Sequence, residues 1–299
     1  MSASFVTALA AAREAAASQN YPQGALYVVA TPSGNLADIS LRALHLLQLA
    51  DCIACEDTRH TQALLRAYGI DKGQGAWISV HRHNEAEGAQ QVVGRLQQGQ
   101  RVVYASDAGT PGVSDPGARV VAAARAAACP VVPVPGASSI TAVLSAAGAA
   151  GDDGGFLFYG FLPAKAQERQ QAVAGLAGET RAVVLLEAPH RIAALAGAVV
   201  PLGNRLVTVG RELTKQFEEI ATVPCSGLAA WLQESSQRTR GEFALVLHPQ
   251  ALVVDEQEPL RVLRLLLAEL PVKTAVRLAA EITGAPRNQL YDAALKEKS

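Results

Sequence analysis

The 299-residue sequence lacks an excess of charge of either sign. Its 26 Lys and Arg residues nearly balance its 27 Asp and Glu residues, so the formal net charge is −1. A chain with so little net charge has no bulk attraction for phosphate, and any nucleic-acid partner must be held by a local basic patch. The charge balance therefore neither supports nor excludes RNA as a partner.

Long hydrophobic runs are also absent, since none reaches the roughly 18 residues that a membrane span requires. The alanine-rich start, MSASFVTALAAAREAAASQN, lacks a basic first segment and carries Arg13 and Glu14 inside its apolar stretch, unlike a secretory signal peptide. The sequence therefore predicts a cytoplasmic protein with no membrane partner. Residues 1–23 are expected to form a flexible tail, frayed or helical.

Cysteine is sparse, and four residues do not make a disulfide framework in a chain of this length. Cys52 and Cys55 form a CxxC pair, but a structural zinc site needs a second pair of ligands, and Cys129 and Cys225 stand alone. CxxC here also reads as a short strand, in which residues three apart point to opposite faces. Buried core thiols are therefore favoured over metal or redox chemistry, and no metal site is predicted.

Several familiar site motifs are missing as well. The sequence has no GxGxxG between a strand and a helix, no GxxxxGK[ST], no HExxH and no GxSxG. A nucleotide-like cofactor, if one binds, must therefore be held by a sequence motif other than these.

What the sequence does contain is an alternation of short apolar strands and helical segments, typical of a parallel α/β sheet. Strands are predicted at 25–30, 52–55, 77–80, 101–106 and 131–134. Helices are predicted at 38–50, 58–69, 85–98, 118–128 and 141–151. Asp38 is expected to cap the first of these helices, and Gly69 to end the second in a left-handed conformation.

The pattern restarts after the GDDGG cluster (151–155), which is the predicted linker region. Four further strands are predicted at 156–161, 181–188, 205–212 and 242–248, and helices punctuated by Pro271 and Pro286 follow from about 257. The length and the 49% of hydrophobic residues suffice for two cores. We expect α/β domains over 24–137 and 138–250 and a helical extension over 251–299.

Glycine-rich and hydroxyl-rich loops follow three of the predicted strands. They are TPSGN (31–35), SDAGTP (106–111) and PGASS (135–139). Backbone amides and small hydroxyls at the carboxyl ends of parallel strands line ligand crevices, although the longer loop SDAGTPGVSDPG is equally consistent with ordinary turn chemistry. The second half adds charged strand ends, EAPHR (187–191), GRELTK (210–215) and RGEF (240–243). Together they indicate a cleft between two domains.

The combination of LYVVATPSGNLADISLRAL, EDTRHT, HRHNE, SDAGTPGVSDPG, PGASS, GFLP, EAPHR, GRELTK and GEFALVL resembles the ribosomal RNA small subunit methyltransferase I family, which has the tetrapyrrole (corrin/porphyrin) methylase fold. The likeness runs from about residue 24 to the end. It implies S-adenosylmethionine bound in the cleft between two α/β domains, and methyl transfer to the ribose 2′-hydroxyl of a decoding-centre cytidine in 16S rRNA. It also implies the small ribosomal subunit, or a late precursor of it, as substrate, and a homodimer.

The resemblance carries cofactor contacts onto three loops. The residues are Pro32, Gly34, Ser106, Asp107, Ala108, Gly109, Thr110, Val113, Ala137, Ser138 and Ser139. Asp107 has an alternative role as the cap of its own turn. Two departures from the family pattern are Ser33, where TPIGN is usual, and Ala137-Ser138-Ser139, where PGPSA or PGPCA is usual. Loss of a proline at 137 is expected to loosen the loop and at most weaken cofactor binding.

Candidates for removing the hydroxyl proton or orienting the ribose are Glu56, Asp57, His83 and Glu187. Candidates for contacting RNA are Arg59, His81, Arg82 and Arg191. Each has a structural alternative. The EDTRHT segment is equally consistent with a helix N-cap and a local ion pair. The two histidines could lie on a solvent-exposed turn, and Arg191 could simply pair with Glu187.

The terminal helices carry basic residues beside apolar ridges, which suits either an RNA-facing surface or ordinary solvated faces. These residues are Arg261, Arg264, Lys273, Arg277 and Arg287. Two rival functions remain. One is a methylase of the same fold acting on a small tetrapyrrole, and EDTRHT, HRHNE and the extension argue against it. The other is a non-catalytic RNA-binding factor in ribosome assembly with a relic cofactor cleft.

Overall fold

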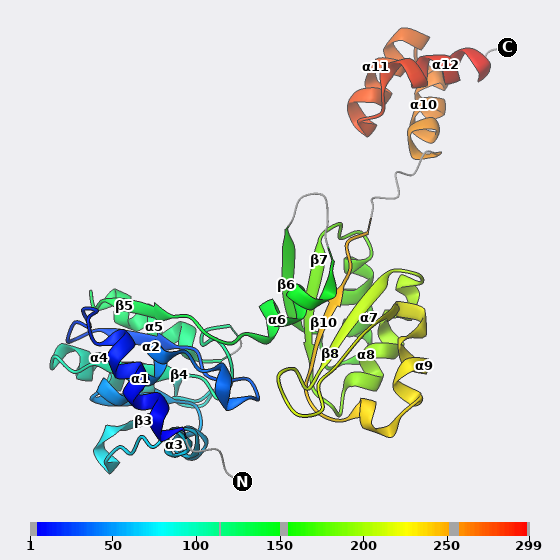
Figure 1. The fold of residues 1–299 in the computed structure, drawn as a ribbon. Coiled ribbons are helices and arrows are strands. Elements are labelled where there is room, and N and C mark those ends of the chain that lie inside the picture. Colours follow the sequence, from blue (N-terminus) through cyan, green and yellow to red (C-terminus); the bar gives the residue numbers. More distant parts are fainter. Residues whose placement is uncertain (1–4, 114, 150–154, 251–256, 298–299) are drawn as a thin grey trace. The chain divides into compact units, whose positions relative to one another are not determined.

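The computed structural model describes residues 5–113, 115–149, 155–250 and 257–297. The chain divides into a larger unit, Met1–Gln250, and a smaller one, Ala251–Ser299. Two five-stranded sheets lie in the larger unit, and the described part of the smaller unit is helical (Figure 1). Residues 151–154 of the expected linker lie outside the described residues.

The first sheet is parallel and has the strand order β3-β2-β4-β1-β5. Its strands are β1 (Leu26–Val29), β2 (Cys52–Cys55), β3 (Trp77–Ser79), β4 (Val102–Ala105) and β5 (Val131–Val134). Every residue of β2 and β4 is buried, because apolar helices cover both faces of the sheet. These helices are α2 (Leu41–Leu49), α3 (Thr58–Ala67), α4 (Glu85–Gln97) and α5 (Gly117–Ala126).

The two cysteines of β2 lie in this core. Cys52 and Cys55 are free thiols with 0% exposure. Burial raises the pKa of both thiols, that of Cys55 to about 11, so they stay protonated at neutral pH. The interpretation as core thiols is confirmed. Among the described residues, no group of three or more His, Cys, Asp and Glu side chains could hold a metal ion.

The start of α2 corrects one prediction. Ser40, and not Asp38, caps this helix, since its Oγ accepts a hydrogen bond from the amide of Ala43 at 3.1 Å. Asp38 ends a short 3-10 turn, Leu36–Asp38, which Asn35 caps, and the extended Ile39 separates that turn from the helix. Gly69 follows α3 at a φ of +80°, which confirms the left-handed helix end.

The N-terminal segment differs from the flexible tail expected over 1–23. Helix α1 (Val6–Ala16) packs against α2, with Ala12 fully buried. The Phe5 ring meets that of Tyr68 at a centroid distance of 5.4 Å, and the Tyr21 hydroxyl donates to the carbonyl of Ala16. Alanine side chains are small enough to let the two helices approach closely, so the alanine-rich composition builds a packed helix.

The second sheet is mixed and has the strand order β6-β7-β10-β8-β9. Its strands are β6 (Phe156–Phe161), β7 (Ala182–Glu187), β8 (Leu206–Arg211), β9 (Glu219–Pro224) and β10 (Phe243–Leu247). Helices α7 (Ala166–Leu176), α8 (Ile192–Val199) and α9 (Leu228–Gln233) cover one face, and α6 (Ser139–Ala147) packs on the other. The predictions omitted β9, an edge strand whose residues alternate between half-buried and exposed.

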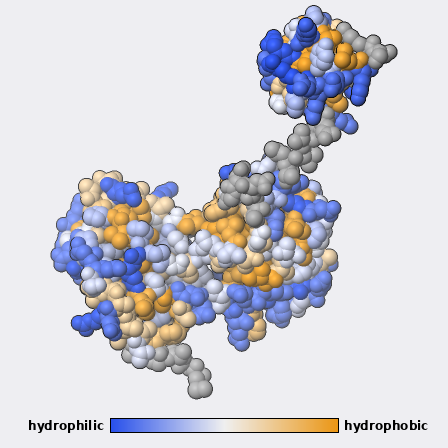
Figure 2. Space-filling model, turned by 45° about the horizontal axis from the view of Figure 1, so that its top comes forward, coloured by the Kyte–Doolittle hydropathy of each residue, from blue (hydrophilic) through white to orange (hydrophobic). Residues whose placement is uncertain are grey.

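The described part of the smaller unit consists of α10 (Gln257–Glu269), α11 (Val272–Thr283) and α12 (Arg287–Glu297). Leu263, Val276 and Leu290 bring the three helices together around a small apolar core. Hydrophilic side chains cover much of the face of this unit seen in Figure 2. None of the helices described anywhere in the chain combines the length and the apolar character needed to cross a membrane.

Candidate functional site

Two strand-end loops of the first sheet are tied to each other. The amides and carbonyls of Thr31 and Gly109 exchange a pair of hydrogen bonds, both 3.0 Å long. The Thr31 hydroxyl donates to the carbonyl of Ser106 at 3.1 Å. Gly109 has a φ of +74°, which only glycine adopts at little cost. The loops after β1 and β4 therefore form one continuous surface.

The third loop, after β5, joins the same surface. The Thr110 hydroxyl donates to the carbonyl of Ala137 at 3.1 Å. Gly136 lies so close to β1 that an added Cβ would stand 3.0 Å from the Cβ of Ala30. The backbone of Ala137 is thus held by Thr110 although the proline usual in the family pattern is missing.

Asp115 organises the rest of the loop after β4. One carboxylate oxygen accepts from the Tyr104 hydroxyl at 2.9 Å and from the amide of Gly117 at 2.8 Å. The other accepts from the amide of Gly112 at 2.8 Å. Burial, with the Asp115 carboxylate next to it, raises the pKa of the Tyr104 hydroxyl, so this hydroxyl remains a donor. The turn interpretation of this part of the loop is confirmed.

Asp107 links the ends of two neighbouring strands. Its Oδ1 accepts a hydrogen bond from the amide of Asp57, which follows β2, at 3.2 Å. The alternative, a cap of its own turn, predicted an acceptor for a later amide of the same loop. The structure instead gives Asp107 an acceptor role toward a loop far away in sequence.

The first of two adjoining cavities lies against these loops and has a volume of about 200 Å³. Among the residues expected to contact the cofactor, eight line this cavity: Ser106, Asp107, Ala108, Gly109, Thr110, Val113, Ser138 and Ser139. Glu56 and Asp115 add two carboxylates to its wall, and Ile140 and Leu186 add apolar surface.

The second cavity, of about 270 Å³, shares Ala108, Ser139 and Leu186 with the first. Most of its wall comes from the second sheet and is apolar: Phe161, Leu186, Ala188, Pro189, Gly210, Leu213, Phe243 and Ala244. None of these residues was predicted as a contact. The motifs GFLP, GRELTK and GEFALVL contain several of them, but an apolar residue in a motif does not distinguish a cavity wall from core.

Pro32, Gly34 and Ala137 line neither cavity. Pro32 is buried, and Gly34 faces the GRELTK loop, where an added Cβ would stand 2.3 Å from Cγ of Lys215. In this structure Gly34 therefore permits close approach of two loops. Its neighbour Ser33, a departure from the family pattern, lines the second cavity.

Asp57 is the N-cap of α3. Its Oδ1 accepts from the amides of Arg59 at 2.8 Å and His60 at 3.4 Å, and Arg59 also pairs with it through its guanidinium at 3.4 Å. The hydrogen bond from the Arg59 amide is the largest of the effects that lower the pKa of this carboxyl. The alternative of a helix cap with a local ion pair is confirmed for EDTRHT.

Glu187 and Arg191 form an ion pair with Nε and Oε1 3.1 Å apart. The Glu187 side chain is only 1% exposed, and the same oxygen accepts from the amide of Ala188. Arg191 also donates to the carbonyl of Leu162. This confirms the alternative that Arg191 pairs with Glu187. Glu187 also lines the second cavity, and within the described residues its other oxygen, Oε2, is buried without a hydrogen-bond partner.

The HRHNE segment forms a turn between β3 and α4. His83 and Arg82 are exposed, and the His81 and His83 rings lie 6.0 Å apart. Asn84, which the sequence reasoning did not single out, holds the turn by accepting from the amide of His81 and donating to the carbonyl of Ser79. The described cavity walls include neither histidine.

Glu56 is half-buried and lies directly after β2 on the wall of the first cavity. Its backbone carbonyl accepts from the hydroxyl of Ser79 at 3.3 Å. Within the described residues its carboxylate has no hydrogen bond or ion pair. Burial, and next the charge of Asp107, raise the pKa of this carboxyl.

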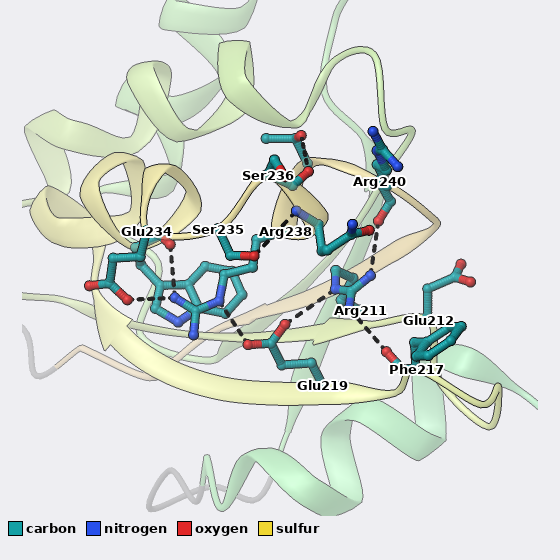
Figure 3. A network of polar contacts seen from close by, with 12 residues as sticks. Arg211, Glu212, Phe217, Glu219, Glu234, Ser235, Ser236, Arg238 and Arg240 are labelled. Carbon is teal, nitrogen blue, oxygen red and sulfur yellow. Dashed lines mark hydrogen bonds and ion pairs between the residues drawn. The ribbon is translucent and has the colours of Figure 1, made fainter.

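A polar network fixes the strand that leads into GRELTK (Figure 3). Arg211, only 7% exposed, pairs with Glu219 at 3.3 Å and donates to the carbonyls of Phe217 and Arg240. Arg238 contacts the other oxygen of Glu219 at 2.8 Å and lies over the Trp231 ring, 4.3 Å from its centroid. The charges at this strand end therefore hold the β8–β9 hairpin next to the cavity.

Comparison with known proteins gives matches along nearly the whole chain. The family model described as Tetrapyrrole (Corrin/Porphyrin) Methylases matches residues 25–229, and one described as RsmI C-terminal HTH domain matches residues 253–298. A protein of Escherichia coli O157:H7 named ribosomal RNA small subunit methyltransferase I is 43% identical over 280 residues, covering 92% of this chain and 96% of its own. The protein of that name from Pseudomonas aeruginosa is 45% identical over 281 residues, covering 92% and 98%.

Solved structures with the same fold are more distant in sequence. A cobalt precorrin-4 methyltransferase of cobalamin biosynthesis aligns with a TM-score of 0.54 at 20% identity, covering 76% of this chain and 98% of its own. The uroporphyrin-III-C-methyltransferase of Thermus thermophilus aligns with a TM-score of 0.53 at 18% identity, covering 76% and 94%.

Proposed function

The chain belongs to the ribosomal RNA small subunit methyltransferase I family, and from this premise we propose that it methylates a ribose 2′-hydroxyl in 16S rRNA with S-adenosylmethionine as donor. The proposed target is a decoding-centre cytidine in the small ribosomal subunit or a late precursor, which places the reaction in the cytoplasm. The observation that carries the proposal is likeness to these methyltransferases along both the α/β unit and the helical extension.

The two cavities suit the two chemical ends of this cofactor. The apolar wall formed by Leu186, Leu213 and Ala244 suits an adenine ring. The Glu56, Asp107 and Asp115 carboxylates on the other wall suit a cationic sulfonium and amino group. When bound, the cofactor supplies a methyl group on a positively charged sulfur.

The contribution of the protein chain to this reaction is mainly positioning. Correct placement of the reacting atoms supplies about 7–11 kcal/mol, whereas a general base contributes roughly 10²–10⁴-fold. Asp107 fixes the loop after β4 against the loop after β2, and Asp115 fixes the loop after β4 internally, before any ligand binds. A rigid wall of this kind suits a reaction in which the attacking oxygen must lie in line with the bond that breaks.

RNA contacts are proposed on two surfaces. Arg82 and His83 are exposed on the turn after β3. The positive charge of Arg59 is partly compensated by its ion pair with Asp57. In the smaller unit Lys273 is exposed, while Arg277 and Arg287 both pair with Glu281. The match of this unit to a helix-turn-helix domain supports a nucleic-acid contact there. The target ribose must be exposed in the RNA for its hydroxyl to reach the methyl carbon.

Methyl-labelled S-adenosylmethionine, incubated with the protein and with small subunits lacking the modification, tests the proposal. We expect label on one decoding-centre cytidine, mapped by resistance of its 3′ phosphodiester to alkaline cleavage. Subunits that already carry the modification serve as the control and should take up no label. Cofactor binding without any label in RNA would contradict the proposal and favour a tetrapyrrole substrate or a binding-only role.

We also propose that the protein is a homodimer. The edge strand β6 exposes Phe156 and Tyr159, with 47% and 37% of their surface accessible, which a monomer would leave in water. Equilibrium sedimentation at micromolar protein should give twice the chain mass, and Phe156→Glu should lower it toward that of one chain. A monomer before any substitution would contradict this proposal.

A further inference from the structure

We infer that Glu56 accepts the proton of the attacking ribose hydroxyl, an inference that rests on the proposed function and names its general base. The geometry points to Glu56 because it is the one candidate whose side chain lines the described cavities without being bound to another group.

The other three candidates fail for separate geometric reasons. The Asp57 carboxylate already accepts hydrogen bonds from the first amides of α3 and pairs with the Arg59 guanidinium. Glu187 lines the second cavity, but its side chain is 1% exposed and its charge is paired with Arg191. His83 lies on an exposed turn that is not part of either cavity wall. A general base must come within hydrogen-bond reach of its proton and have its charge unpaired, so the ion pairs of Asp57 and Glu187 and the position of His83 argue against these groups before their basicity is considered.

The backbone of Glu56 is held from both sides. On one side, Asp107 accepts from the amide of the next residue, Asp57, at 3.2 Å. On the other, Ser79 at the end of β3 donates to the carbonyl of Glu56 itself at 3.3 Å. The strand end is therefore anchored to β3 and to the loop after β4, while the carboxylate remains unbound. A fixed main chain with an unbound acceptor is what a base needs to meet a substrate hydroxyl.

The groups around Glu56 come from several elements. Burial raises the pKa of its carboxyl most, Asp107 and Asp115 from the loop after β4 raise it further, and Arg82 and His81 from the turn after β3 lower it. The net effect is a pKa above that of an ordinary glutamate. A more basic carboxylate accepts a proton more readily, and it remains largely ionised at neutral pH as long as its pKa lies below 7.

The proposed step balances as follows. The 2′-oxygen forms a bond to the methyl carbon, and the carbon–sulfur bond breaks with its electron pair moving onto sulfur. The hydroxyl proton passes to a carboxylate oxygen of Glu56. A cationic sulfonium and an anionic carboxylate thus become a neutral thioether and a neutral carboxylic acid, beside a methylated ribose. Loss of the proton to water then restores the carboxylate.

Single-turnover labelling of small subunits at saturating S-adenosylmethionine tests this role. Glu56→Gln should lower the rate constant by about 10²–10⁴-fold, because the amide cannot accept the proton. Glu56→Asp keeps a carboxylate on a shorter side chain, so its rate constant should fall less than that of Glu56→Gln. The matched control is Glu168→Gln, on the exposed start of α7, which should leave the rate unchanged.

The pH dependence separates a base from a structural carboxylate. In the unsubstituted protein the rate should rise with pH through the raised pKa of Glu56, since only the ionised form accepts a proton. Glu56→Gln should lack this limb. A merely structural Glu56 would leave the limb in place.

The pH dependence of protein stability, measured without cofactor or RNA, provides a further test of the raised pKa of Glu56. A carboxyl whose pKa is raised on folding stabilises the protein below its unfolded pKa, and this contribution disappears as pH rises through the folded value. The stability of Glu56→Gln relative to the unsubstituted protein should therefore increase from pH 4 to pH 7. No such change would show that the carboxyl is not perturbed by its surroundings.

The outcomes distinguish this inference from the proposed function. An unchanged single-turnover rate for Glu56→Gln would overturn the inference and leave the methyltransferase function standing. Weaker cofactor binding with an unchanged rate at saturation would also overturn it, since Glu56 would then serve only the cofactor. If the unsubstituted protein labels no RNA, the proposed function fails, and the inference fails with it.

Discussion

Calorimetry should detect no binding of S-adenosylmethionine to an Asp107→Ala variant at concentrations that saturate the unsubstituted protein. Asp107 lines the first cavity, and its Oδ1 also holds the amide of Asp57 at the end of β2. The alanine variant loses a carboxylate that can bind a cationic or hydroxyl group, which is worth about 1.5–3 kcal/mol. It also leaves the loop after β2 without its brace, and both losses reduce affinity.

Asp107→Asn separates the two contributions. The asparagine carbonyl can still accept from the Asp57 amide, so the brace is kept while the charge is lost. We expect affinity between those of the alanine variant and the unsubstituted protein, and Glu168→Gln again serves as the unaffected control. Undiminished affinity in the alanine variant would show that the cofactor lies elsewhere in the protein.

Replacing Arg205 by methionine should lower the free energy of unfolding by about 3 kcal/mol, because several buried carbonyls lose their donor at once. Arg205 is 6% exposed. Its guanidinium donates to the carbonyls of His248 and Leu176, both at 2.7 Å, and to those of Glu179 and Arg181 at 3.1 and 3.3 Å. It joins the end of α7 to the segments before β7 and after β10. Relief from burying the charge offsets part of the loss.

Urea unfolding followed by Trp231 fluorescence measures this effect near its source. The chain has only two tryptophans, so a Trp77→Phe background leaves the second sheet as the reporter. The free energy of unfolding of Arg205→Lys should lie between that of Arg205→Met and that of the unsubstituted protein, since one ammonium group cannot reach all four carbonyls. The control is Arg119→Met, which removes a surface pair with Glu85 and should cost about 0–1 kcal/mol. If Arg205→Met lowered the free energy of unfolding by no more than this control, the four hydrogen bonds of Arg205 would not stabilise the protein as predicted.

The sequence predicted the first sheet well, and the reason lies in its burial. Strands such as β2 and β4 are buried on both faces and therefore read as unbroken apolar runs between helical segments. The edge strand β9 carries no such run and was missed. Asp38 and Ser40 are both suitable capping residues two positions apart, and only the extended conformation of Ile39 decided between them.

Part of the candidate site could likewise be predicted from the sequence, and part could not. Glycines and hydroxyl residues after β1, β4 and β5 were recognisable, because few other residues permit such turns, and eight of the expected contacts line the first cavity. The apolar wall of the second cavity was not recognisable. Leu213 and Ala244 have the composition of core residues, and only their position at the ends of β8 and β10 exposes them to a ligand.

By itself, the sequence determined most of the strands and helices and the loops that reach the site, since these depend on local periodicity and on residues with special backbone freedom, and its motifs carried the resemblance to the family. Tertiary structure alone decided which polar side chains remain available. Asp107 meets Asp57, 50 residues away, only after folding, and the carbonyl of Leu162 fixes Arg191, which the sequence already offered as a partner of Glu187. A carboxylate is available for chemistry only where its neighbours in space leave it unpaired, and several of those neighbours come from distant parts of the chain.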